Sequence, residues 1–127
     1  MLTENFFDSD GVSLHFIDWG GSGRPLVLLA GLGGTAQLFR GLAPRLAERF
    51  RVAALTRRGH GRSDRPEAGY DLDTMVDDIR RFLDTMGFPR AILVGHSWAG
   101  IEMPRFATRY PERVEAVIYL DALHQLL

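Results

Sequence analysis

One serine lies in a segment whose residue types and spacing are typical of nucleophilic catalysis. Residues 93–100 read Leu-Val-Gly-His-Ser-Trp-Ala-Gly, so Ser97 stands between an apolar run and a helical pattern. A sharp strand-to-helix turn that exposes a serine hydroxyl needs small residues two positions before and after it. Gly95 and Ala99 are small enough, although glycine is usual at the second position. The alternative is an exposed serine that only caps a helix.

A second segment would complete such a site. On the expected turn, the backbone N–H of Trp98 points from a helix N-terminus into the space beside Ser97 and can stabilise developing negative charge. Residues 30–35, Ala-Gly-Leu-Gly-Gly-Thr, follow an earlier apolar run, and their glycines let backbone N–H groups approach a ligand. Two glycine-containing turns, one of them carrying a serine, are what acyl transfer requires.

The elements that must position these turns can be read from the apolar pattern. Four short runs without polar interruption predict strands buried on both faces of a parallel sheet, at residues 26–29, 52–55, 91–94 and 117–120. Before them, residues 5–7 and 12–19 flank the turn-forming segment Asp-Ser-Asp-Gly, which predicts a β-hairpin.

Three helices are expected between the strands, over residues 37–49, 71–86 and 98–110. The second has the clearest apolar stripe, with Asp71 as N-cap, Gly87 after its end, and Asp77, Asp78, Arg80 and Arg81 on the solvent side. The order β-β-β-α-β-α-β-α-β predicts one α/β domain over residues 1–127. Its open, mostly parallel sheet has about six strands and helices on both faces.

The amino-acid composition limits the kinds of chemistry and of binding that this chain can perform. The formal net charge is −1 and the 15 basic residues are all arginine, which argues against a nucleic-acid surface and excludes any lysine-dependent site within these residues. Cysteine is absent and the four histidines lack metal-ligand spacing, so a metal site is not expected. Chemistry by serine, histidine and carboxylate or by a bound cofactor stays open at this point, and the hydrolase function favoured below uses no cofactor. The longest apolar run has five residues, too few to span a membrane, and no leader pattern opens the sequence, so a cytoplasmic protein is expected.

Taken together, these residues resemble the α/β-hydrolase family. The matching pieces are the N-terminal hairpin, the turn at residues 31–32, the loop Arg-Gly-His-Gly-Arg-Ser at residues 58–63, the turn around Ser97 and residues 110–114. The resemblance implies that Ser97 is the nucleophile and that Leu32 and Trp98 supply the two oxyanion N–H groups. It also implies a domain that lacks the family's lid and last two strands. Ala30 and Thr56 depart from the His and Asp common in the family.

The family's catalytic histidine follows strands that lie beyond the sixth, so its source is open here. Asp121 ends the sixth predicted strand and is a candidate acid, or a plain cap. His124 is a candidate base, or a tail residue without a partner. The other three histidines, His15, His60 and His96, suit structural roles better.

Three further charged residues each allow two interpretations. Glu102 lies about one helical turn beyond Ser97 and either binds a substrate amine or pairs with an arginine. The adjacent Arg57 and Arg58 fit ion pairs that hold their loop better than an anion site.

Three functions remain open. The first is a serine hydrolase, or the N-terminal portion of one, which cleaves carboxylic esters through an acyl-enzyme on Ser97. A serine nucleophile argues against epoxide hydrolase and haloalkane dehalogenase chemistry, which uses a carboxylate. The second is an NADP-binding module that uses Gly31-x-Gly33. The third is a non-catalytic half-domain. An edge strand bounded by Val117 and Leu120 would then pair with another copy or with a complementing C-terminal half.

Overall fold

The N-terminal hairpin is present as expected. In the computed structural model, which describes residues 2–122, β1 (Thr3–Ser9) pairs antiparallel with β2 (Val12–Gly20). The two residues between them, Asp10 and Gly11, have φ values of 51° and 90°. Two successive positive φ values give a turn whose twist matches that of the strands it joins.

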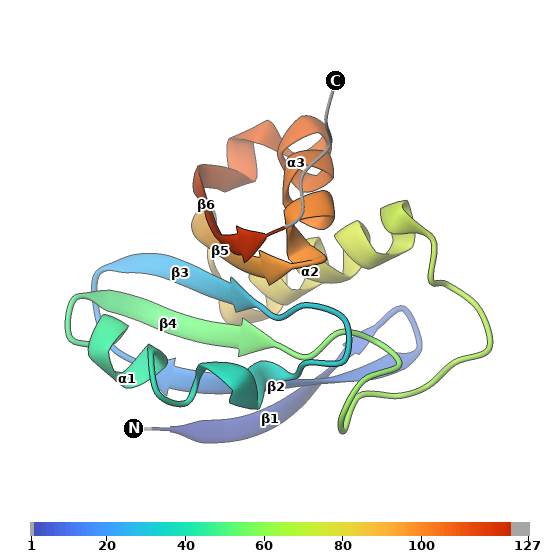
Figure 1. The fold of residues 1–127 in the computed structure, drawn as a ribbon, viewed down its shortest axis with the longest axis horizontal. Coiled ribbons are helices and arrows are strands. Elements are labelled where there is room, and N and C mark those ends of the chain that lie inside the picture. Colours follow the sequence, from blue (N-terminus) through green and yellow to red (C-terminus); the bar gives the residue numbers. More distant parts are fainter. Residues whose placement is uncertain (1, 123–127) are drawn as a thin grey trace.

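Four parallel strands continue the sheet: β3 (Arg24–Leu29), β4 (Phe50–Leu55), β5 (Ala91–Ser97) and β6 (Val114–Ala122). The strand order is β1-β2-β4-β3-β5-β6, and β2 is antiparallel to β4. The arrowheads of β3 to β6 point to the same side in Figure 1, so the loops that follow these strands meet at one edge. The predicted open, mostly parallel six-stranded sheet is confirmed.

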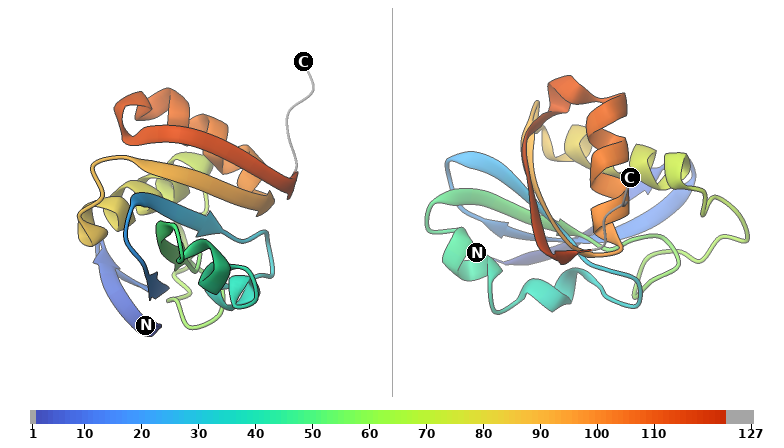
Figure 2. Two further views of the ribbon diagram at one scale, coloured as in Figure 1. Left: turned by 90° about the vertical axis from the view of Figure 1, so that its left-hand side faces the viewer. Right: turned by 45° about the horizontal axis from the view of Figure 1, so that its top comes forward.

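Helices cover both faces of the sheet (Figure 2). One face packs against α2 (Leu72–Met86) and α3 (Ala99–Arg109), and the other against η1 (Ala36–Phe39) and α1 (Ala43–Leu46). Along β3, Val27 and Leu29 join the first core, whereas Leu26 and Leu28 join the second. Alternate residues of a strand point to opposite faces, so an uninterrupted apolar run is needed where both faces are covered.

The helix predicted over residues 37–49 is wrong. The segment contains one 3₁₀ turn, η1, and the four-residue α1. Pro44 lies in the first turn of α1, where its missing N–H costs nothing, but it cannot continue a helix that arrives from residue 37. Gly41 between the two pieces further weakens a continuous helix.

The helix predicted over residues 71–86 is confirmed, with one correction. The Asp71 side chain accepts the Thr74 N–H at 3.0 Å, and Gly87 ends the helix with a φ of 71°. Asp78, however, does not face solvent: it is 3% exposed. Its carboxylate is held by Arg58 and by the Ser9 hydroxyl, which replace the water it would otherwise need. A short 3₁₀ turn, η2 (Pro111–Arg113), follows α3 and leads into β6.

Candidate active site

Ser97 lies on a strained turn at the end of β5. Its φ is 55°, and within residues 2–122 the only other non-glycine residue with a positive φ is Asp10 in the hairpin. A non-glycine residue pays an energetic cost for this conformation, and such costs concentrate at functional sites. Helix α3 begins two residues later, with Trp98 at its N-cap. The sharp strand-to-helix turn expected from the sequence is therefore present.

Small residues make that turn sterically feasible. A Cβ atom added to Gly95 would lie 2.6 Å from Met103 Cε and 2.8 Å from Ala99 Cβ, closer than real Cβ contacts allow. Ala99 itself is fully buried. The chain thus needs glycine before the serine but accommodates alanine after it, which explains the departure from the usual second glycine.

The structure brings Ser97 against Gly31, the first residue of the predicted oxyanion turn. A Cβ atom on Gly31 would lie 2.5 Å from Ser97 Cβ and 3.0 Å from Ser97 Oγ. Parallel pairing of β3 with β5, in register at Leu29 and Gly95, sets the two turns side by side. The next residue, Leu32, is 62% exposed, so this part of the edge faces solvent. Together, Gly31 and Leu32 are called the 31–32 turn below.

A buried arginine holds the 31–32 turn from beneath. Arg57 Nη2 donates to the Ala30 carbonyl at 2.8 Å, and Nη1 donates to the Gly31 carbonyl at 3.2 Å. The same guanidinium forms a two-point ion pair with Glu102 on α3, with Nε 3.0 Å from Oε2 and Nη2 bonded to Oε1. Glu102 is 2% exposed. Of the two roles expected for Glu102, the structure places it in a pair with an arginine.

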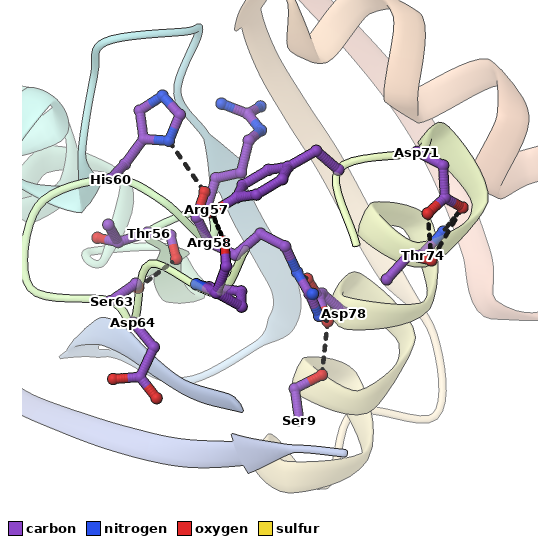
Figure 3. Close-up of polar contacts among 12 residues, drawn as sticks. Ser9, Thr56, Arg57, Arg58, His60, Ser63, Asp64, Asp71, Thr74 and Asp78 are labelled. Carbon is purple, nitrogen blue, oxygen red and sulfur yellow. Dashed lines mark hydrogen bonds and ion pairs between the residues drawn. The ribbon is translucent and has the colours of Figure 1, made fainter. Parts of the chain in front are cut away.

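The neighbouring Arg58 points to another part of the molecule (Figure 3). Its Nε and Nη2 atoms donate to the two carboxylate oxygens of Asp78 at 2.7 and 2.8 Å, and the Ser9 hydroxyl donates to the same carboxylate at 2.6 Å. The bonds from Asp78 raise the pKa of the Arg58 guanidinium despite its burial. Both arginines therefore hold the loop by ion pairs, as expected, and neither is free to bind an anion.

Thr56, where the family commonly has Asp, belongs to a buried polar network. Its hydroxyl oxygen accepts the Ala36 N–H at 3.0 Å and lies 2.9 Å from His15 Nδ1. His15 Nε2 lies 3.3 Å from a Glu4 carboxylate oxygen. Burial lowers the pKa of His15, outweighing the opposite effect of Glu4. When the ring is neutral, Nε2 can donate to Glu4 while Nδ1 accepts from the Thr56 hydroxyl.

The remaining predicted residues are placed as follows. His60 Nδ1 lies 3.1 Å from the Arg58 carbonyl, and His96 is half-buried with no partner for Nδ1. Within residues 2–122, no histidine ring is hydrogen-bonded to the Ser97 hydroxyl. Asp121 lies in β6, where the pairing shifts from His96–Leu120 to Ser97–Ala122. Its backbone therefore lies beside that of Ser97, and its role as the acid stays a prediction. His124 lies outside the described residues.

Neither a metal-binding cluster nor a membrane-spanning helix occurs within residues 2–122. Residues 2–122 contain no group of three or more His, Cys, Asp or Glu side chains arranged to hold a metal ion. None of the helices described is both long enough and apolar enough to cross a membrane.

Sequence comparison identifies related hydrolases. Residues 24–126 match the family model described as alpha/beta hydrolase fold. The 2-(acetamidomethylene)succinate hydrolase of Mesorhizobium japonicum is 38% identical over 101 residues, which cover 80% of this chain and 36% of that protein. The soluble epoxide hydrolase of Corynebacterium sp. strain C12 is 36% identical over 118 residues, covering 93% and 41%. This chain therefore spans well under half the length of these relatives.

Solved structures agree with that assignment. The epoxide hydrolase CorEH superposes with a TM-score of 0.93 at 34% identity, covering 100% of this chain and 44% of its own. Cfl2 from Burkholderia cenocepacia superposes with a TM-score of 0.91 at 37% identity, covering 97% and 42%. The family model, the relatives and the strand order all agree, and the chain belongs to the α/β-hydrolase family.

Proposed function

We propose that this chain is a serine hydrolase of carboxylic esters, or the N-terminal portion of one, with Ser97 as nucleophile. The observation that carries the proposal is the position of the Ser97 hydroxyl, on a left-handed turn ahead of a helix and against Gly31. Ser97 Oγ attacks the ester carbonyl carbon and its proton passes to a base. The alcohol then leaves with a proton, and water hydrolyses the acyl-serine.

Two backbone donors stabilise the negative charge that forms on the carbonyl oxygen during each step. Trp98 is the N-cap of α3, so its N–H lies at the helix N-terminus, where the helix dipole also favours an anion. The N–H of Leu32 belongs to the turn that touches Ser97. Donors fixed in place before reaction act on the transition state without reorganisation, and this is usually the largest single contribution to catalysis.

The general base comes from outside residues 2–122 in this proposal. The three histidines within that range are engaged elsewhere or lack a bond to Ser97. His124, a neighbouring copy or a C-terminal half supplies the imidazole, and Asp121 is the acid that orients it. Because the three sources differ in dependence on protein concentration and on His124, they can be separated experimentally.

Two alternatives have less support. The relatives include proteins named as epoxide hydrolases, but a serine, not a carboxylate, occupies the turn of this chain. An NADP-binding role for Gly31-x-Gly33 would need a helix after the glycines to hold the pyrophosphate. The segment that follows is a four-residue 3₁₀ turn, and Arg57 and Arg58 are both paired with carboxylates.

Labelling with a fluorophosphonate tests the proposal, because only a serine activated by a base and an oxyanion hole reacts quickly. We expect one adduct by intact mass, together with slow hydrolysis of p-nitrophenyl acetate. Ser97→Ala should lose both, whereas the exposed Ser22→Ala should keep both. An adduct that persists in Ser97→Ala would overturn the assignment of the nucleophile.

The edge strand of the sheet, β6, suggests a second, non-catalytic role. Within residues 2–122, β6 pairs only with β5, and its Ile118 and Tyr119 side chains are 45% and 47% exposed. An unpaired strand edge of this kind attracts another strand. The alternative proposal is therefore a non-catalytic half-domain that pairs through β6 with a second copy or a complementing half. An oligomer in sedimentation without any labelling at Ser97 would favour it, and a clean monomer would argue against self-pairing.

A further inference from the structure

The structure assigns to Arg57 a role beyond that of holding its loop: we propose that it positions the oxyanion donor at Leu32. The inference rests on the proposed function, in which the Leu32 N–H binds the oxyanion. Arg57 does not reach the reacting atoms, so it is a positioning residue. Its side chain touches both carbonyls that precede the Leu32 amide, those of Ala30 and Gly31.

Peptide geometry links those contacts to the donor. The Gly31 carbonyl and the Leu32 N–H belong to one peptide unit, which is planar and trans, so the two groups point in opposite directions. Holding the carbonyl therefore fixes the direction of the N–H. Arg57 Nη1 holds it at 3.2 Å and the Gly34 N–H holds it at 3.1 Å. Bonds to the carbonyl oxygen also polarise the amide and strengthen its N–H as a donor.

Glu102 ties the same guanidinium to the helix that follows the nucleophile. Helix α3 begins two residues after Ser97, the last residue of β5, and Glu102 lies in the first turn of that helix. Through Glu102, Arg57 connects the 31–32 turn directly to α3, across two strands of the sheet. Both partners are buried, with side chains 8% and 3% exposed, so solvent screens this connection little. This connection restricts movement of the 31–32 turn relative to α3, which begins after Trp98.

Only the shape of arginine permits this set of contacts. The planar fork places Nε and Nη2 on the carboxylate while Nη1 and Nη2 reach two successive carbonyls. A lysine would keep the charge but has a single nitrogen, so it cannot reach Glu102 and both carbonyls together. Arg57→Lys is therefore a selective test, and Arg58→Lys is its matched control. Arg58 is the next residue, is also buried and also pairs with a helix carboxylate, but its side chain forms no hydrogen bond with the 31–32 turn.

The test compares both variants of the full chain by two readouts: amide ¹H–¹⁵N spectra and the rate of Ser97 phosphonylation by a fluorophosphonate. Arg57→Lys should move the Leu32 and Gly33 amide signals and slow phosphonylation by about 10- to 100-fold. Arg58→Lys should leave those signals in place and change the rate by less than about 2-fold. Thermal unfolding of both variants separates these effects from a general loss of stability.

Two results would overturn the inference: unmoved Leu32 and Gly33 signals in Arg57→Lys, or equal movement in Arg58→Lys. If the unmodified chain does not react with the reagent, hydrolysis by this chain on its own is ruled out, but the amide comparison still decides the role of Arg57. If Arg57→Lys does not fold, Glu102→Gln takes its place, because it removes the charge and keeps the shape. It should move the same two amides, and their failure to move would also overturn the inference.

Discussion

Two adjacent arginines form similar buried ion pairs and yet connect different parts of the molecule. Arg57 pairs with Glu102 on α3, and Arg58 pairs with Asp78 on α2. The other contacts of the first pair are the carbonyls of Ala30 and Gly31, beside Ser97. The other contact of the second is the hydroxyl of Ser9 in the hairpin. The Arg57–Glu102 pair thus supports the candidate site. The Arg58–Asp78 pair joins the N-terminal hairpin and α2 to the loop that follows β4.

This comparison shows that a buried ion pair does not reveal its role by burial or charge alone. Removing two charges from water costs roughly what their attraction returns, so such pairs are weak evidence for stability. The remaining hydrogen bonds of each side chain decide what the pair positions. Variants of the two pairs should therefore differ in reactivity more than in stability.

The largest effect on stability is predicted for a variant that breaks the ion pair between Arg58 and Asp78. Arg58→Ala leaves the carboxylate of Asp78 buried with only the Ser9 hydroxyl as a partner. An unpaired buried charge of this kind costs about 3–5 kcal/mol of unfolding free energy. Urea denaturation followed by circular dichroism measures the loss. Replacing both partners by apolar residues, Arg58→Met with Asp78→Leu, should recover most of it. A loss below about 1 kcal/mol in Arg58→Ala would contradict the assignment.

A smaller effect on stability, but a direct effect on the site, is expected at Gly31. In Gly31→Ala the new methyl would lie 2.5 Å from Ser97 Cβ, so one of the two turns must move. Overpacking of this kind costs about 1–3 kcal/mol, and fluorophosphonate labelling of Ser97 should slow as well. Gly41→Ala is the control, because a Cβ there meets nothing within 4 Å. Unchanged labelling in Gly31→Ala would show that the contact does not shape the site.

Local sterics made much of this predictable from the sequence. The sharp turn is predictable because only small residues fit on either side of the serine, and here these are Gly95 and Ala99 around Ser97. The buried strands were predictable because each must present apolar residues to both faces. The helix predicted over residues 37–49 is wrong because Gly41 and Pro44 interrupt the segment.

Long-range pairing was harder to predict. Asp78 occupies a polar position of α2 by sequence, and its burial depends on Arg58 and on Ser9, which is 69 residues away. The contacts of Arg57 with the 31–32 turn also join segments 26 and 27 residues apart. The only signal in the sequence was a pair of arginines shortly after a buried strand, together with a carboxylate about one turn beyond Ser97. That signal predicts that the arginines form ion pairs, but it does not predict which carboxylate each arginine binds.

The smallest predicted effect concerns His15. Its ring contacts the hydroxyl of Thr56, the residue before the two arginines, and not a charged partner. Burial lowers the pKa of His15 below its ordinary value of 6.5, with the nearby Glu4 opposing this shift and Arg62 adding to it. The unfolded chain therefore binds more protons than the folded chain once the pH falls below 6.5, and stability is lost from there downward. Arginine partners also lower the pKa values of Asp18 and Asp73, overcoming the opposite effect of burial. Protonation of these two carboxylates therefore destabilises the protein only below about pH 3.8. Urea midpoints should therefore fall between about pH 7.5 and about pH 5, and fall less in His15→Gln, which keeps a donor and an acceptor. An equal fall in both proteins would place the titrating group elsewhere.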